Sequence, residues 1–158
     1  MLLQQVFTPA SIKIGLQSIE KDELIEELVD VLARNGGREF PRDAALAAIR
    51  ERENKMSTGI KKGIALPHGK VEGIDGLLGV IGISRHGIDY DSLDGQPVYL
   101  VFMLLSSPKD SELHLGALKR LARLLDDPGF YTELVGSEAP ERAFGILKSF
   151  EDHLTLRS

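Results

Sequence analysis

Histidine is the side chain whose unperturbed pKa places its change of charge near neutral pH, and His68 stands in an informative context. It lies between Pro67 and Gly69, directly after the apolar run of residues 64–66. Pro67 ends that run, because proline has no N–H for a sheet ladder and keeps the preceding residue out of the helical region. Ligands of α/β folds commonly bind where strands end, and Gly69 would let another backbone or a partner's surface approach closely. His68 is therefore a candidate site residue, with an exposed loop histidine as the alternative.

A second histidine, His114, lies on the apolar face of a predicted helix. At ~3.6 residues per turn it lines up with three leucines further along the helix, Leu118, Leu121 and Leu125. It therefore points inward from the first turns, where backbone N–H groups and the helix dipole favour an anion. The alternative is a core histidine bonded to a backbone carbonyl. The remaining two histidines, His86 in a predicted turn and His153 near the C-terminal end, are expected at the surface.

Several polar residues could gather around His68 and His114 to bind an anion. Arg52 ends an inward line of a predicted helix that also contains two alanines and Ile49. Ser57 and Thr58 follow, with hydroxyls and free backbone N–H groups. An inward arginine, hydroxyls and histidines without a nearby acidic cluster are typical of an anion receptor. The alternatives are an arginine that stabilises a helix C-terminus and a solvated turn after it.

The composition limits the other chemistries. The formal net charge of -5 argues against a nucleic-acid partner, and the absence of cysteine excludes disulfides, thiolate nucleophiles and zinc sites built on sulfur. Two histidines far apart in sequence, without a carboxylate at ligand spacing, make a poor zinc site, so we expect no metal. The N-terminal residues show no signal-peptide pattern, and the longest apolar run, residues 98–105, is too short to span a bilayer. We therefore expect a cytoplasmic protein without membrane insertion.

Hydrophobic periodicity predicts the elements that position these side chains. Predicted helices at 21–34 and from about residue 41 are followed by strands at 64–66, 77–83 and 98–105, the last one apolar throughout and therefore expected in mid-sheet. Turns are predicted at 85–87 and 93–95. A helix then runs from about 108 or 110 to 126, is ended by residues 127–129, and is followed by a last helix from 137. This order indicates a single α/β layered domain over residues 1–158, with a loosely ordered tail from about 152.

Three stretches together resemble a known family. They are RENKMSTGIKKGIALPHGK from residue 52, DGQPVYLVFMLLSSP from residue 94 and HLGALKRLARLL from residue 114. They resemble the enzyme IIA domain of the bacterial phosphotransferase system, in its fructose and mannitol class and particularly in its nitrogen-regulatory members. The resemblance covers nearly the whole chain. It implies a mixed β-sheet with helices on both faces, in agreement with the order of predicted elements.

The resemblance also implies roles for the candidate residues. His68 matches the histidine that accepts a phosphoryl group from a small phosphocarrier protein, HPr or its nitrogen-branch homologue. His114 matches the family's second histidine, and Arg52, Ser57 and Thr58 match its phosphate contacts. Transfer between two imidazoles depends on a neutral acceptor and on positioning and charge stabilisation, so it requires neither a metal nor a cofactor.

One local departure concerns partner docking. Lys61 and Lys62 stand where the family has small or polar residues. Two cations near the acceptor could hold the phosphate, or could repel a phosphocarrier with a basic docking face. The alternative is a pair of solvated lysines.

Two kinds of function follow if His68 is phosphorylated. We favour a switch, in which phosphorylation controls binding to regulatory targets such as transporters or kinases. The other is a relay that passes the phosphoryl group to a IIB component and so to a sugar. A further alternative, of a different class, is a non-phosphorylated anion-binding or scaffold domain. A metal-dependent hydrolase would need more acidic or histidine ligands near His68.

Overall fold

The computed structural model describes residues 1–157, and of Lys61 and Arg157 it describes only the backbone. The α-helices are α1 (Leu3–Val6), α2 (Lys21–Gly36), α3 (Arg42–Lys55), α4 (Ser111–Leu125), α5 (Pro128–Val135) and α6 (Pro140–Arg157). The strands are β1 (Ile12–Ile14), β2 (Gly59–Lys61), β3 (Ile64–Ala65), β4 (His68–Lys70), β5 (Leu77–Ile88) and β6 (Val98–Ser106). Short 3-10 turns, η1 (Pro9–Ser11), η2 (Gly37–Glu39) and η3 (Pro108–Asp110), complete the order.

The strands form one mixed sheet centred on β6. Its order is β1-β5-β6-β3-β2, and β4 also pairs with β6, beyond the end of β3. β5 runs antiparallel to β6, whereas β3 and β4 run parallel to it. Since β6 has neighbours on both edges and is buried along almost its whole length, its uninterrupted apolar sequence is explained. The mixed α/β fold expected from the sequence is confirmed.

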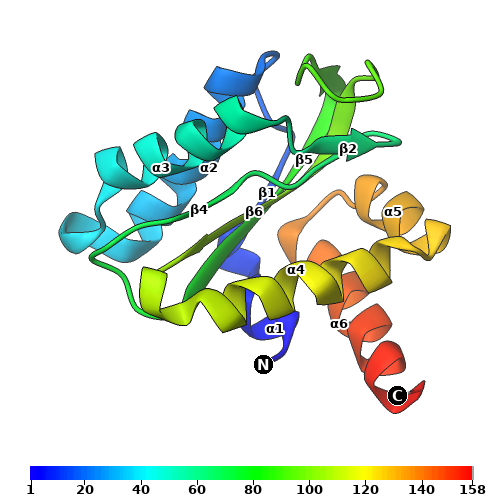
Figure 1. Cartoon of the computed structure of the whole chain (residues 1–158). Helices are drawn as coiled ribbons and strands as arrows, with labels where there is room; N and C mark the ends of the chain where they lie inside the picture. Colours follow the sequence, from blue (N-terminus) through cyan, green and yellow to red (C-terminus); the bar gives the residue numbers. More distant parts are fainter. Residues whose placement is uncertain (158) are drawn as a thin grey trace.

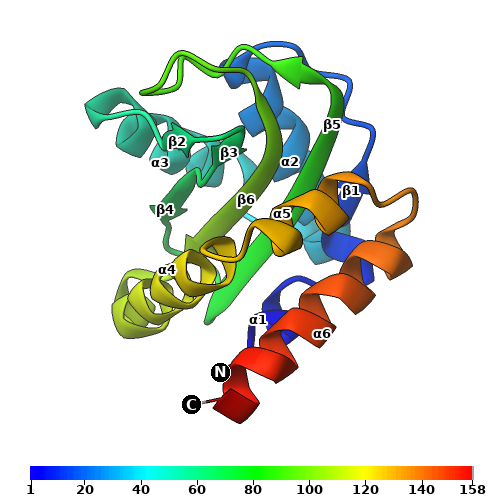
Figure 2. The same ribbon diagram turned by 90° about the vertical axis from the view of Figure 1, so that its right-hand side faces the viewer.

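Helices cover both faces of this sheet (Figures 1 and 2). Alternate residues of β6 face opposite ways, as the period of a strand requires. Val101, Met103 and Leu105 pack in the core under α2 and α3. The other face carries Leu100, Phe102 and Leu104, which pack in a second core with α4, α5 and α6.

Three local predictions are corrected. Residues 85–87, expected as a turn, lie inside β5, where the register with β6 shifts and the hydroxyl of Ser84 accepts a hydrogen bond from the backbone N–H of Gly87. Residues 127–129 end α4 but also begin α5, because Asp127 caps its N-terminus and Pro128 occupies its first turn. The last helix begins at Pro140 rather than at Ser137, and it continues through the residues from 152 on, for which we expected loose order. No helix in residues 1–157 combines the length and the apolar character that crossing a bilayer requires.

A buried carboxylate, Glu151 of α6, joins three helices. Its oxygens accept hydrogen bonds from the backbone N–H groups of Leu3, at 2.6 Å, and Gln4, at 3.0 Å, at the start of α1. Its Oε2 also lies 2.6 Å from Nε of Arg120 in α4. Glu151 has no exposed surface, and its charge is matched by a cation and by N–H donors. This side chain therefore anchors α1 and α6 to the helix that carries His114.

Replacing Glu151 by glutamine removes the charge that these donors surround. We expect Glu151→Gln to lower the free energy of unfolding by about 2–4 kcal/mol, because a buried ion pair loses one partner. Urea denaturation measures the loss. The neighbouring Asp152→Asn is the matched control: Asp152 bonds Lys148 and Gln4 at the surface, so its unfolding midpoint should stay close to that of the unmodified protein. Equal effects of the two substitutions would contradict the anchoring role of Glu151.

Candidate functional site

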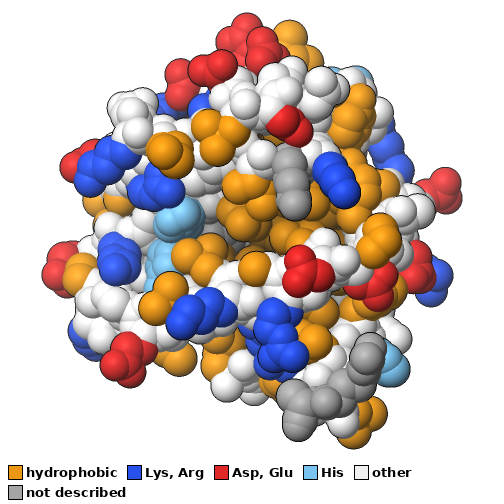
Figure 3. All heavy atoms as spheres, turned by 45° about the vertical axis from the view of Figure 1, so that its right-hand side comes forward, with side chains coloured by type: hydrophobic (Ala, Val, Ile, Leu, Met, Phe, Trp, Pro, Cys, Tyr) orange, Lys and Arg blue, Asp and Glu red, His pale blue; other side chains and the backbone are white. Residues whose placement is uncertain are grey.

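A cleft lies between α3, β4 and α4 and has a volume of about 600 Å³. Side chains at helical spacing on α3 and α4 line it, together with the residues of β4. The lining residues are Ala48, Glu51, Arg52, Lys55, His68, Gly69, Lys70, Ser111, His114, Leu115 and Leu118. Figure 3 shows histidine side chains in this hollow, with lysine and arginine side chains near them and a wide hydrophobic area beside them.

Close packing fixes the strand that presents His68. β4 pairs in parallel with the end of β6, so that His68 lies opposite Leu104. Gly69 is buried, and a Cβ atom at this position would lie 3.1 Å from the backbone of Ala48 in α3. The glycine therefore lets β4 run directly against α3. This close approach is made within the molecule, and it holds the adjacent His68 at the cleft.

One nitrogen of His68 is held by the backbone, and the other has no hydrogen-bond partner among the described residues. Nδ1 lies 2.7 Å from the carbonyl oxygen of Leu66. Because a carbonyl can only accept, Nδ1 carries the ring proton and donates it, which leaves a lone pair on Nε2. Burial lowers the pKa of His68 below its ordinary 6.5, and the Arg52 charge lowers it further, although the Leu66 carbonyl acts in the opposite direction. The neutral form with a nucleophilic Nε2 is thus favoured near neutral pH.

His114 lies directly beside His68. The two ring centroids are 5.3 Å apart and the rings meet edge to face at 65°. The side chain of His114 is buried, with 4% of its surface exposed, and its Nδ1 lies 2.7 Å from the hydroxyl of Ser106. Its Nε2 has no hydrogen-bond partner among the described residues. Burial, with smaller contributions from the charges of His68 and Lys70, lowers the pKa of His114 to about 4.

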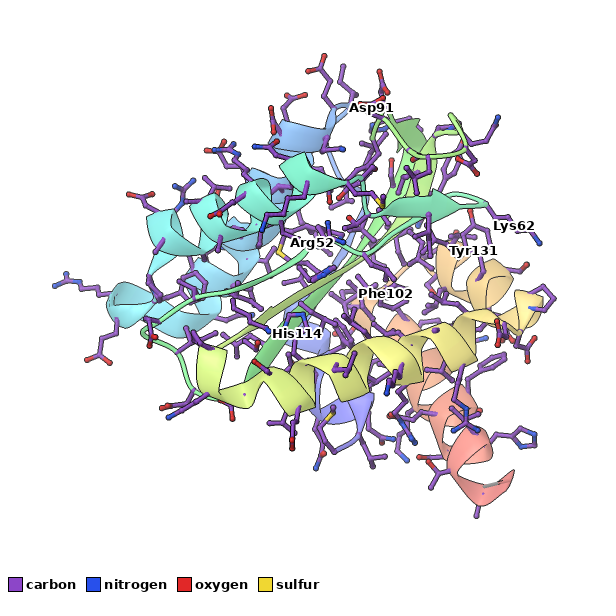
Figure 4. The ribbon with its side chains drawn as sticks, in the orientation of Figure 1. Arg52, Lys62, Asp91, Phe102, His114 and Tyr131 are labelled. Carbon is purple, nitrogen blue, oxygen red and sulfur yellow. The ribbon has the colours of Figure 1, made fainter. Side chains whose placement is uncertain are left out.

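Three cations line the cleft around these rings. Arg52 donates from Nη1 to the carbonyl oxygen of Met56, at 2.9 Å, and this contact holds it at the end of α3. Figure 4 shows Arg52 and His114 reaching into the cleft from α3 and α4. Lys55 and Lys70 are the other two. In the part of the chain that the structure describes, no acidic side chain forms an ion pair with these three.

Sequence analysis missed Lys55 and Lys70, although spacing contained a signal for both. Lys55 is three residues after Arg52, which places the two on one face of α3. Lys70 is two residues after His68, so both side chains leave the same side of β4. The strand signal was hidden because β4 has only three residues and its pairing with β6 cannot be read locally.

Ser57 and Thr58 lie outside the lining of the cleft. The hydroxyl of Ser57 accepts a hydrogen bond from the N–H of Gly59, at 3.1 Å. Thr58 is buried, and both its N–H and its hydroxyl donate to the carboxylate of Glu53. Tyr90 and Lys21 donate to the same carboxylate, each at 2.9 Å. Burial alone would raise the pKa of Glu53, but the hydrogen bonds from Thr58 and Lys21 hold it below its usual value. The geometry therefore gives Thr58 a structural contact.

Lys61 and Lys62 lie in the β2–β3 hairpin, and Lys62 is outside the cleft lining. The backbone of Lys61 is in β2, and its side chain is outside the described residues. Lys62 is exposed and has a left-handed backbone, with a φ of 53°. Its N–H donates to Asp94 at 3.1 Å. Figure 4 shows Lys62 at the tip of the hairpin, well away from His114.

The described residues contain no group of three or more histidine, aspartate or glutamate side chains placed to hold a metal ion. The cleft instead presents two histidines and three cations beside one carboxylate, Glu51, and this excess of positive charge suits an anion. His86 and His153 are exposed, as expected, and lie outside the cleft.

Comparison with known proteins identifies the family. The model of the phosphoenolpyruvate-dependent sugar phosphotransferase system, EIIA 2, matches residues 5–150. The chain belongs to this family. Among relatives, a fructose-specific EIIABC component from Bacillus subtilis is 36% identical over 151 residues, which cover 96% of this chain and 24% of that protein. A nitrogen regulatory protein from Bradyrhizobium diazoefficiens is 31% identical over 147 residues, covering 93% of this chain and 95% of the relative.

The EIIA fold is found in solved structures as well. The crystal structure of the nitrogen regulatory protein IIA-Ntr from Neisseria meningitidis matches with a TM-score of 0.84 and 26% identity, covering 92% of this chain and 98% of that one. The family resemblance read from the sequence is thereby confirmed. This EIIA chain spans about a quarter of its fructose-specific relative, 24% of its length, but nearly the whole of the two nitrogen-regulatory proteins named above.

A first prediction concerns Thr58. We expect Thr58→Val to lower the free energy of unfolding by about 1–3 kcal/mol, because the buried Glu53 carboxylate loses a charge-assisted hydrogen bond. Urea denaturation measures the change. Ser57→Ala is the matched control, since Ser57 makes one hydrogen bond in a half-buried turn and its loss should cost below about 1 kcal/mol. A Thr58→Val protein as stable as the control would contradict the buried network.

A second prediction concerns pH. The unfolded chain protonates His114 near pH 6.5 and the folded chain only near pH 4, so the unfolded state binds more protons between these values. Stability from this residue is therefore complete above pH 6.5 and is lost on acidification, by about 2 kcal/mol between pH 7 and pH 5. NMR titration of the imidazole and urea denaturation at both pH values test this. His114→Gln should reduce the loss by that amount, and a ring that titrates near pH 6.5 would contradict it.

Proposed function

We propose that this EIIA chain is a phosphoryl carrier and a regulatory switch. His68 accepts a phosphoryl group from the phosphohistidine of a small phosphocarrier, HPr or its nitrogen-branch homologue. The phosphorylation state then controls binding to regulatory targets such as transporters or kinases. The observation that carries this proposal is the free Nε2 of His68, which faces a cleft lined by cations while Nδ1 is tied to the Leu66 carbonyl.

The proposed reaction moves one phosphoryl group between two imidazoles. A bond forms between phosphorus and Nε2 of His68 while the N–P bond of the donor breaks. The proton on Nδ1 of His68 stays hydrogen-bonded to Leu66, so no proton has to cross between the proteins. Such a transfer has a loose transition state with charge on the equatorial oxygens, so catalysis depends mainly on positioning and on nearby positive charge.

Residues around His68 suit these two tasks. Arg52, Lys55 and Lys70 supply positive charge that no carboxylate in the described residues neutralises by an ion pair. His114 offers a buried, unpartnered nitrogen beside the acceptor ring. We assign these four side chains to binding the phosphoryl group.

Other sequence candidates fit supporting tasks. In this proposal Ser57 and Thr58 hold the turn after α3 rather than contact the phosphate, because their hydroxyls are engaged in protein hydrogen bonds. Gly69 keeps His68 against α3. The exposed Lys62 and its neighbour Lys61 would meet a docked partner at the edge of the contact area, away from the transferred group.

Similarity in both sequence and length supports the regulatory form of the function. The nitrogen-regulatory relative and the solved IIA-Ntr chain match this chain over nearly their whole length. The fructose-specific relative supports the alternative, a relay to a IIB component, because its identity to this chain is also substantial. Both functions require the same phosphohistidine, so its formation is tested first.

The decisive measurement is intact mass after incubation with phosphoenolpyruvate, enzyme I and either phosphocarrier. We expect the unmodified protein to gain one acid-labile phosphoryl group on Nε2 of His68, and His68→Ala to gain none. His114→Ala should remain a substrate but react roughly 10–1000-fold more slowly, since it keeps the nucleophile and loses charge stabilisation.

His153→Gln is the control, because His153 lies exposed on α6 outside the cleft. It should be phosphorylated at the rate of the unmodified protein. The proposal fails if neither carrier phosphorylates the protein, or if His68→Ala still gains the group. Transfer from the phosphorylated protein to IIB components would then separate the relay from the switch.

A further inference from the structure

Ser106 of β6 contacts His114, the buried histidine of the cleft. Its hydroxyl lies 2.7 Å from Nδ1 of His114, and this is the one hydrogen bond that the hydroxyl makes among the described residues. Ser106 has no exposed surface, so water does not compete for that hydroxyl. Its backbone is fixed as well, because the carbonyl accepts from the N–H of Val71 at 2.9 Å and the residue pairs with Lys70 in the sheet.

Neutral His114 has two possible tautomers. They differ in how many polar groups of His114 and Ser106 have a hydrogen-bond partner. If Nδ1 carries the proton and donates to Ser106, the serine's own hydrogen has no acceptor, and the lone pair of Nε2 is also unpartnered. If Ser106 donates to Nδ1 instead, the hydroxyl hydrogen is satisfied and only the N–H at Nε2 remains without a partner. Leaving a buried polar group unpaired is costly, so the second arrangement is favoured.

The unpartnered group in the favoured arrangement belongs to the ring that lies beside the acceptor. Nε2 of His114 is buried, and its ring meets that of His68 edge to face at 5.3 Å between centroids. A phosphoryl group bound to His68 would bring three acceptor oxygens close to the His114 ring. Burial keeps His114 neutral, so this N–H can serve as a donor only in the tautomer that protonates Nε2.

We propose that Ser106 is a positioning residue that fixes His114 in the tautomer with its proton on Nε2, which makes His114 a hydrogen-bond donor to the phosphoryl group. This inference rests on the proposed function and deepens it, because it assigns a role to a residue that touches neither phosphate nor partner. The strand pattern supports it: Ser106 continues the line of Leu100, Phe102 and Leu104 on the face of β6 that packs against α4. The hydrogen bond to His114 accounts for a polar residue at the end of that apolar line.

The tautomer can be measured directly on the unphosphorylated protein. Long-range proton–nitrogen NMR spectra distinguish a protonated Nε2 from a protonated Nδ1 in a neutral imidazole. We expect His114 of the unmodified protein to carry its proton on Nε2. Ser106→Ala should move the population toward protonated Nδ1, and Ser106→Thr, which keeps a hydroxyl, should restore protonated Nε2. A proton on Nδ1 in the unmodified protein would overturn the proposal.

The rate of phosphoryl transfer from the carrier provides the second readout. Ser106→Ala should slow it about tenfold, the equivalent of one hydrogen bond in the transition state. In a His114→Ala background the same substitution should have no further effect, because Ser106 acts through that ring. Ser84→Ala is the matched control: Ser84 is also buried and accepts a hydrogen bond from the N–H of Gly87 in β5, outside the cleft.

The two proposals fail in distinguishable ways. An unmodified protein that no carrier phosphorylates defeats the proposed function, whereas the NMR tautomer still decides what Ser106 does to His114. A Ser106→Ala protein with an unchanged tautomer and an unchanged rate defeats the role of Ser106 alone. Slowing by Ser106→Ala that persists in the His114→Ala background would show a structural effect and would also overturn it.

Discussion

The parallel pairing of β4 with the end of β6 is the interaction on which the site depends. It sets His68 opposite Leu104 and Lys70 opposite Ser106. Because α4 follows β6 after the short η3 turn, the same strand end also brings His114 to the cleft. His68 is therefore held in β4 against the buried central strand, and His114 is held in the helix that follows this strand. Reactive groups held by rigid elements keep the geometry that transfer between two proteins requires.

Burial and charge act together on the two rings. Burial is the main cause that lowers the pKa of both His68 and His114, and nearby cations add to it. The rings are consequently neutral at a pH where free histidine is partly charged, which leaves His68 nucleophilic and keeps His114 from adding positive charge. Cations that would repel a charged imidazole can thus remain in the cleft, ready for an anion.

Acidic residues with structural roles are kept away from those cations. Glu53 and Glu151 are both buried, and each is surrounded by its own donors. Glu53 follows Arg52 directly in α3, yet the two side chains make different contacts. The arginine lines the cleft, and the carboxylate accepts hydrogen bonds from Thr58 and Tyr90. Two neighbouring residues of one helix thereby contribute separately to a cationic cleft and to a buried hydrogen-bond network, and among the described residues no ion pair joins the two.

The sequence by itself determined the fold class, the central strand, the inward orientation of His114 and, through its family resemblance, the identity of His68 as the candidate acceptor. These follow from local periodicity and from motifs that adjacent residues form. Only the tertiary structure decided that Lys70 and Lys55 line the cleft. It also decided that Thr58 forms its hydrogen bond with Glu53 and that Ser106 forms one with His114. Each of these contacts either joins separate elements or depends on the orientation of a side chain. Strand register and packing determine both the pairing of elements and the side-chain orientation, and no local sequence pattern encodes them.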